Sequence, residues 1–199
     1  MKKILLFALT ASLAAPAFAS NFPYSNIDVA IGKMRLDEDF VFAGEVYEEF
    51  GTFSLSGAYQ FNSNFALGLG TSAFANDGPD TEVVGVAVAL TALFPFAVGD
   101  QLDIVPSVGL LSSEIELCQH NWCYSDSDSG ISYGLGLRAW IVPKELELTA
   151  GITDSTLEDS EPLVSVGGAL WWQNQHSLRL NYSSDKDTSQ VSLGYRYSF

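Results

Sequence analysis

The chain has 199 residues, and its 24 acidic and 9 basic side chains give a formal net charge of −15. That length is enough for one domain. The acidity argues against a nucleic-acid partner, because the phosphates would be repelled. After the first twenty residues, no uncharged apolar stretch reaches the roughly 20 residues that a membrane-spanning helix needs.

The first twenty residues have the pattern of a secretory signal peptide. Lys2 and Lys3 precede an apolar run, and Ala17 and Ala19 form an A-x-A cleavage site before Ser20. The run is too short for the alternative, a membrane anchor. We therefore expect a signal peptide over residues 1–19. The mature domain, residues 20–199, would have 180 residues, 7 of them basic and 24 acidic, and a charge of −17.

Apolar residues alternate with small or polar ones along the whole mature chain. Side chains two residues apart lie on the same face of a strand, so such a segment has one apolar face and one small or polar face. Nine segments show the pattern, and a tenth, residues 26–36, shows it less regularly. The ten are 26–36, 53–61, 65–70, 84–94, 103–110, 131–141, 146–152, 164–172, 178–183 and 191–199.

The connections between these segments alternate between two lengths. Short turns are expected at residues 62–64, 97–101, 143–145 and 173–176, and longer, more polar loops at 37–49, 76–81, 114–129, 154–161 and 184–187. This arrangement is typical of a transmembrane antiparallel up-and-down β-barrel, with both termini on the short-turn side. We expect an all-β barrel of about ten strands, with eight as the alternative.

A soluble β-sandwich would show the same alternation. Three features favour a lipid-facing barrel. The small parity is rich in Gly, Ala and Ser, which suits a narrow lumen, and the chain carries an export signal. In addition, aromatic residues gather at strand ends, as in a membrane-interface girdle. They are Phe61, Phe65, Phe94, Phe96, Trp140, Trp171, Trp172, Tyr195 and Tyr197.

The last residues resemble the C-terminal insertion signal of bacterial outer-membrane proteins. Tyr195, Tyr197 and Phe199 alternate toward a terminal aromatic, with Gly194 in the small position. The whole mature chain is similar to the small OmpA/OmpX-like outer-membrane barrels, whose smallest members have eight strands. This resemblance implies a bacterial outer-membrane location, and it implies that the barrel assembly machinery recognises Phe199.

Charged residues also occur on the small, lumen-facing parity. Asp103, Arg138, Glu147, Arg179 and Arg196 lie there, and Asp28 is a further candidate. Charges inside a barrel must pair or be hydrated. Their places near the short turns predict a cluster that acts either as an ion-pair plug or as the constriction of a narrow channel. The plug is favoured, because small barrels are filled by side chains.

The longest loop contains the sequence CQHNWC. In an exported chain, Cys118 and Cys123 are expected to form a disulfide. His120 between them suggests a metal site, but a fourth ligand is lacking. No cofactor or metal is expected.

Nineteen of the 24 acidic residues fall in or beside the long loops. They form either a solvated, self-repelling surface or sites for divalent cations that bridge to lipopolysaccharide phosphates. No loop has EF-hand spacing.

We expect a monomeric integral outer-membrane barrel with a structural or surface-interaction role. The alternative is a narrow, weakly cation-selective pore whose acidic loops concentrate cations at its mouth. A lipid A-modifying hydrolase is less favoured, because such a site needs a nucleophile or activated water beside a histidine. Only His120 and His176 are available, so the chain is not expected to be an enzyme.

Overall fold

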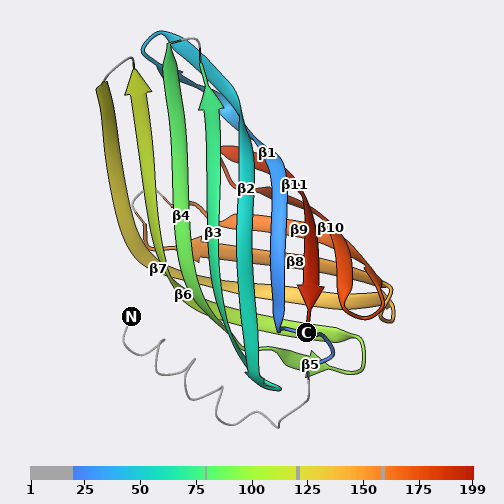
Figure 1. Ribbon diagram of the computed structural model, residues 1–199. Helices are drawn as coiled ribbons and strands as arrows, with labels where there is room; N and C mark the ends of the chain where they lie inside the picture. Colours follow the sequence, from blue (N-terminus) through green and yellow to red (C-terminus); the bar gives the residue numbers. More distant parts are fainter. Residues whose placement is uncertain (1–19, 79, 120–121, 158–159) are drawn as a thin grey trace.

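The computed structural model describes residues 20–199, apart from 79, 120–121 and 158–159 (Figure 1). The predicted signal peptide with Ala17 and Ala19 lies outside the described residues, as does His120. The described strands are β1 (Asn26–Phe42), β2 (Glu45–Asn62), β3 (Phe65–Asp77), β4 (Thr81–Leu93), β5 (Phe96–Val98), β6 (Leu102–Gln119), β7 (Trp122–Val142), β8 (Leu146–Ser155), β9 (Leu163–Trp172), β10 (His176–Ser184) and β11 (Thr188–Ser198).

The strands form one closed antiparallel barrel. Each long strand pairs with its neighbours in chain order, with β4 next to β6, and β11 returns to pair with β1. The closing register runs from Asn26 opposite Ser198 to Leu36 opposite Thr188. The prediction of an up-and-down barrel is therefore confirmed.

The short strand β5 continues β4, so the barrel wall has ten strands. Both β4 and β5 pair with β6 in one continuous register. They are separated at Phe94 and Pro95, and Pro95 has no N–H to donate to a ladder. The Phe94 N–H donates to the Pro106 carbonyl at 2.9 Å, which keeps the two pieces aligned. The expected count of about ten is correct.

The two parities of the strands face opposite sides of the wall. Large apolar side chains such as Ile31, Leu110 and Leu180 are exposed on the outside. The inside carries glycine, alanine, serine and threonine, together with the charged residues that the alternation placed there. The outer surface of the barrel is thus apolar, and the lumen is narrow and polar.

No helix long and apolar enough to cross a membrane is found among the described residues.

One side of the barrel wall is taller than the other. β1, β2, β6 and β7 have 17 to 21 residues, whereas β8 to β11 have 9 to 11. The end of the barrel away from this raised side carries the short turns, and all of them are tight. The first described residues and the C-terminus lie at this short-turn end. Figure 1 shows β2, β3, β4, β6 and β7 rising beyond the ends of β8 to β11. We call the raised part the tall wall.

The prediction of loops at residues 37–49 and 114–129 is wrong, because the chain there largely forms strands of the tall wall. Residues 37–49 continue β1 and β2 up to a two-residue turn at Ala43 and Gly44, both with positive φ, as two-residue hairpins favour. Most of the expected loop 114–129 is likewise the ends of β6 and β7. Above a bilayer the outer face of a hairpin meets water instead of lipid, so it lacks the outward apolar residues that mark lipid-facing strands.

The surroundings of Gly32 show how tightly the strands pack on the lumen side. A Cβ at Gly32 would lie 2.3 Å from the Val191 carbonyl oxygen and 2.9 Å from Thr52 Oγ1. At Gly136, which also faces the lumen, the nearest atom would be 3.6 Å away. We expect Gly32→Ala to lower the free energy of unfolding by about 1–3 kcal/mol through overpacking, and Gly136→Ala to cost much less.

The measurement is urea unfolding in detergent micelles, followed by tryptophan fluorescence. Equal losses for Gly32→Ala and Gly136→Ala would contradict this account of the inner packing.

Candidate functional site

The short-turn end of the lumen is filled by a strap, residues 20–25, that precedes β1. Its Phe22 and Tyr24 are each only 3% exposed. The Phe22 ring stacks on Trp140 with centroids 4.7 Å apart, and Trp140 meets Trp171 edge-on at 5.8 Å. Trp140 Nε1 also donates to the Asn21 carbonyl at 3.2 Å. These four rings form an aromatic floor across the barrel.

Trp140 and Trp171 were expected in the outer girdle, and that expectation is wrong. Both are buried inside, 7% exposed. They share the inward parity of Arg138 and Ala169, which decides their direction although they lie at strand ends. Their neighbour Trp172 has the other parity and is exposed on the outside.

Asp103 ties the strap to the barrel wall. This fully buried carboxylate accepts hydrogen bonds from Ser20 Oγ at 2.8 Å, the Asn21 backbone N–H at 3.1 Å and Asn21 Nδ2 at 3.0 Å. The Tyr24 hydroxyl donates a further bond at 3.1 Å. The strap thus supplies the donors that a buried carboxylate requires.

Arg138 and Glu147 form a second, separate unit just above the floor. Arg138 Nε donates to Glu147 Oε1 at 2.7 Å and Nη2 donates to Oε2 at 3.0 Å, a bidentate pair. Trp171 Nε1 also donates to the Glu147 carboxylate at 2.9 Å. The guanidinium lies between the rings of Phe22 and Tyr24, 4.6 and 4.7 Å from their centroids. The pair is therefore locked to the strap as well as to the wall.

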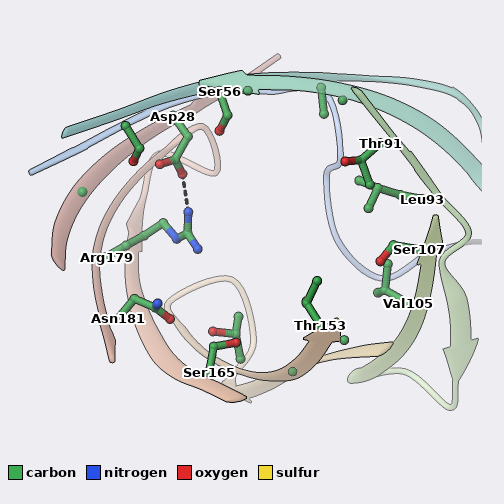
Figure 2. A pocket seen from close by; sticks show the side chains of 18 of the residues that line it. Asp28, Ser56, Thr91, Leu93, Val105, Ser107, Thr153, Ser165, Arg179 and Asn181 are labelled. Atoms are coloured by element: carbon green, nitrogen blue, oxygen red, sulfur yellow. Dashed lines mark hydrogen bonds and ion pairs between the residues drawn. The ribbon is translucent and has the colours of Figure 1, made fainter. Parts of the chain in front are cut away.

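Asp28 organises the third unit. Arg179 Nη1 and Arg196 Nε both donate to the same oxygen, Asp28 Oδ2, with the Arg196 bond at 3.0 Å. Figure 2 shows Asp28 and Arg179 pointing toward one another on one side of the lumen. The structure thus brings the five charged lumen residues that the sequence singled out, and Asp28 with them, into the short-turn half.

Above the floor, the lumen contains a cavity of about 630 Å³. It is lined mostly by small and polar side chains, which belong to inward-facing residues of nearly every strand (Figure 2). Arg138, Arg179 and Arg196 line it together with Asp28. The cavity reaches Ser183 and Gln190, which lie close to the upper ends of β10 and β11.

A second apolar cluster, not foreseen from the sequence, lies inside the tall wall. Tyr47, Phe50 and Val83 are buried there, and Met34, Leu36, Phe42, Phe74 and Leu117 pack against them. Phe50 and Phe74 meet edge-on with centroids 5.3 Å apart. The parity of Met34, Leu36 and Phe74 with neighbouring lumen residues was the available signal.

Glu45 stabilises the top of this cluster. Its carboxylate accepts hydrogen bonds from the Thr81 hydroxyl, the Asp80 N–H at 3.0 Å and the Tyr47 hydroxyl at 3.3 Å. The Thr81 hydroxyl bond contributes most to holding the pKa of Glu45 below its usual value. The charged form of this carboxylate is therefore favoured at the tip of the tall wall.

Cys118 and Cys123 face one another in β6 and β7 and form a disulfide. Within the described ranges, the one group of three potential metal ligands is these two cysteines with Glu116. Because both sulfurs are bonded to each other, neither offers the thiolate that a metal would bind.

The C-terminal aromatics point outward at the short-turn end. Tyr195, Tyr197 and Phe199 are exposed on the outer face, and Gly194 is inside. His176, at the start of β10, stacks on Trp172 and contacts the Tyr195 hydroxyl at 2.6 Å. His176 thus belongs to an outer aromatic band rather than to the lumen.

The family model described as "Outer membrane protein beta-barrel domain" matches residues 5–199. No curated protein sequence matches the chain. Among solved structures, an outer membrane channel from Pseudomonas putida F1 is similar at a TM-score of 0.50 and 11% identity, over 94% of this chain and 100% of that one.

Ail, the attachment invasion locus protein of Yersinia pestis, has a TM-score of 0.47 and 15% identity, over 87% of this chain and 99% of that one. The N-terminal barrel domain of Pseudomonas aeruginosa OprF has a TM-score of 0.46 and 16% identity, over 89% of this chain and 98% of that one. At such identities a structural likeness concerns the fold alone. The match along almost the whole chain, together with the closed ten-stranded barrel, means that this protein belongs to the outer membrane protein β-barrel family and resides in the bacterial outer membrane.

Proposed function

We propose that the protein is a non-conducting outer-membrane barrel with a structural or surface-interaction role. The observation that carries this proposal is the aromatic floor, in which Phe22 of the strap packs between Trp140 and the buried Arg138 and Tyr24 packs on the same guanidinium. Short turns face the periplasm in barrels of this kind, so the floor closes the periplasmic end. The tall wall then stands on the outside of the cell.

The tall wall is the part that meets the surroundings. It is stiffened by its inner apolar cluster and by the disulfide between β6 and β7. Its edges and tips carry exposed carboxylates, among them Glu114, Glu116 and Asp126. We propose that these bind divalent cations, which prefer oxygen ligands, and so bridge to lipopolysaccharide phosphates.

We further propose that the chain is exported by a signal peptide over residues 1–19, and that the barrel assembly machinery recognises its terminal strand through Tyr195, Tyr197 and Phe199. It would act as a monomer, since within the described residues the ladder closes around the lower, membrane-spanning part of the wall. The competing function, a narrow cation-selective pore, requires that the floor open.

Planar-bilayer conductance separates these two functions. We expect the purified protein to be silent, because the rings block the lumen. The double variant Phe22→Ala/Trp140→Ala should give discrete conductance steps, whereas Trp172→Ala, which removes an outward ring, should stay silent. Steady single-channel currents from the unaltered protein would overturn the proposal in favour of the pore.

The Arg138–Glu147 pair should be essential to the plug. We expect Arg138→Met to cost about 3–5 kcal/mol of unfolding free energy, because it leaves a buried carboxylate without its partner. Replacing both residues, in Arg138→Met/Glu147→Leu, should restore much of this loss. Lys33→Met is the control: it breaks an exposed pair with Glu49, worth at most about 1 kcal/mol.

Urea unfolding in micelles measures all three variants. If Arg138→Met cost no more than Lys33→Met, the pair would not hold the plug together.

Cleavage before Ser20 would place a new α-ammonium group beside Asp103. Ser20 Oγ and the Asn21 N–H already contact this carboxylate, so the charge of the freed terminus would lie close to it. Mass spectrometry of the purified protein should show a chain that begins at Ser20. One added alanine before Ser20 should lower the unfolding temperature, and in an Asp103→Asn background the same addition should have a much smaller effect.

An equal loss in both backgrounds would mean that the ammonium group and Asp103 do not interact. A purified chain that still carried residues 1–19 would contradict the cleavage itself.

A further inference from the structure

Two lumen arginines, Arg179 and Arg196, depend on a single carboxylate, Asp28. Arg179 and Arg196 share one oxygen of Asp28, and their side chains are 25% and 13% exposed. Within the part of the chain that the structure describes, their remaining N–H groups have no hydrogen-bond partner. Two planar donor groups are thus left with free edges beside the cavity that they line.

The other carboxylates in the described lumen do not accept hydrogen bonds from the free N–H groups of Arg179 and Arg196. Glu147 already accepts hydrogen bonds from Nε and Nη2 of Arg138 and from Trp171 Nε1. The three guanidiniums of Arg138, Arg179 and Arg196 and the three carboxylates of Asp28, Asp103 and Glu147 balance in charge, so what remains beside the cavity is unused N–H donors of Arg179 and Arg196. Asp103 is occupied separately by the strap.

The cavity beside these guanidiniums suits a hydroxylated ligand. Its lining offers hydroxyl and amide groups from several strands, namely Ser54, Ser56, Ser165, Asn181, Gln190 and Ser192. Figure 2 shows Arg179 and Asn181 directed into the same space as Ser56 and Ser165. A solute would enter from the outer side, because the lining reaches the upper ends of β10 and β11 and the floor closes the other end.

From this arrangement we infer a binding site in the lumen for a small hydroxylated organic anion. A phosphate or carboxylate group binds the free edges of Arg179 and Arg196, since guanidinium matches such oxyanions with paired, charge-assisted hydrogen bonds. The hydroxyl groups of the ligand contact the serine and amide side chains of the lining. The acidic tips of the tall wall do not prevent this, because exposed charges are screened over about 8 Å at physiological ionic strength. The site does not depend on whether the floor conducts.

The experiment is calorimetric titration of the purified full chain in an uncharged detergent. Glucose 6-phosphate is the probe, and glucose is its neutral control. We expect saturable one-to-one binding of glucose 6-phosphate and no binding of glucose. Arg179→Gln should weaken the binding about ten-fold or more, as expected for lost hydrogen bonds to a charged group.

Two further variants separate a binding site from a merely structural ion pair. Asp28→Asn should tighten glucose 6-phosphate binding, because it removes the carboxylate that competes for both guanidiniums. Lys186→Gln removes one exposed positive charge outside the lumen and should leave the affinity unchanged. Mobility shifts between boiled and unboiled samples on gels show which variants still form closed barrels.

Absence of binding by both the unaltered protein and a folded Asp28→Asn variant would overturn the inference, as would equal binding of glucose. If neither lumen variant folded, the contrast between glucose 6-phosphate and glucose in the unaltered protein would decide the matter by itself. Equal weakening by Arg179→Gln and Lys186→Gln would reduce the effect to overall charge and also refute the site.

Discussion

The fold depends on closing the backbone hydrogen-bond ladder. Within hydrocarbon each unpaired N–H or C=O costs several kcal/mol, so strands can cross a membrane only in a barrel without edges. The pairing of β1 with β11 closes the ladder in the lower part of the wall, and β5 extends the ladder past Pro95. Once the wall is closed, its parity fixes an apolar surface for lipid and a polar one for the lumen.

A closed wall of ten strands encloses a lumen that side chains can nearly fill. Inward glycines such as Gly32 therefore sit against neighbouring backbone, while the strap and its aromatic floor occupy the periplasmic end. Buried charges there are stable only with partners. Asp103 takes its donors from the strap, Glu147 from Arg138, and Asp28 accepts from two guanidiniums. The unused N–H groups of these two guanidiniums therefore lie beside the cavity in the lumen.

The prediction of strands from the sequence succeeded where one face of a strand meets lipid and the other meets the lumen, because neighbouring residues there alternate between apolar and small or polar. It failed above the membrane, where the outer face of a hairpin meets water instead of lipid: residues 37–49 and 114–129 were predicted to be loops but largely form strands. It also failed for Trp140 and Trp171, because nearness to a strand end was given more weight than parity. Tyr47 and Phe50 were missed because a core inside the tall wall has no counterpart in a uniform barrel.

By itself, the sequence determined which side chains point outward and which point inward, because the two-residue period of a strand is a local property. It also determined the approximate number of strands, through the spacing of the alternating segments. Only the tertiary structure decided which charges meet. Arg179 reaches Asp28 across 151 residues of chain and Asn21 reaches Asp103 across 82, since circular closure and the return of the strap into the lumen bring together segments that no local pattern links.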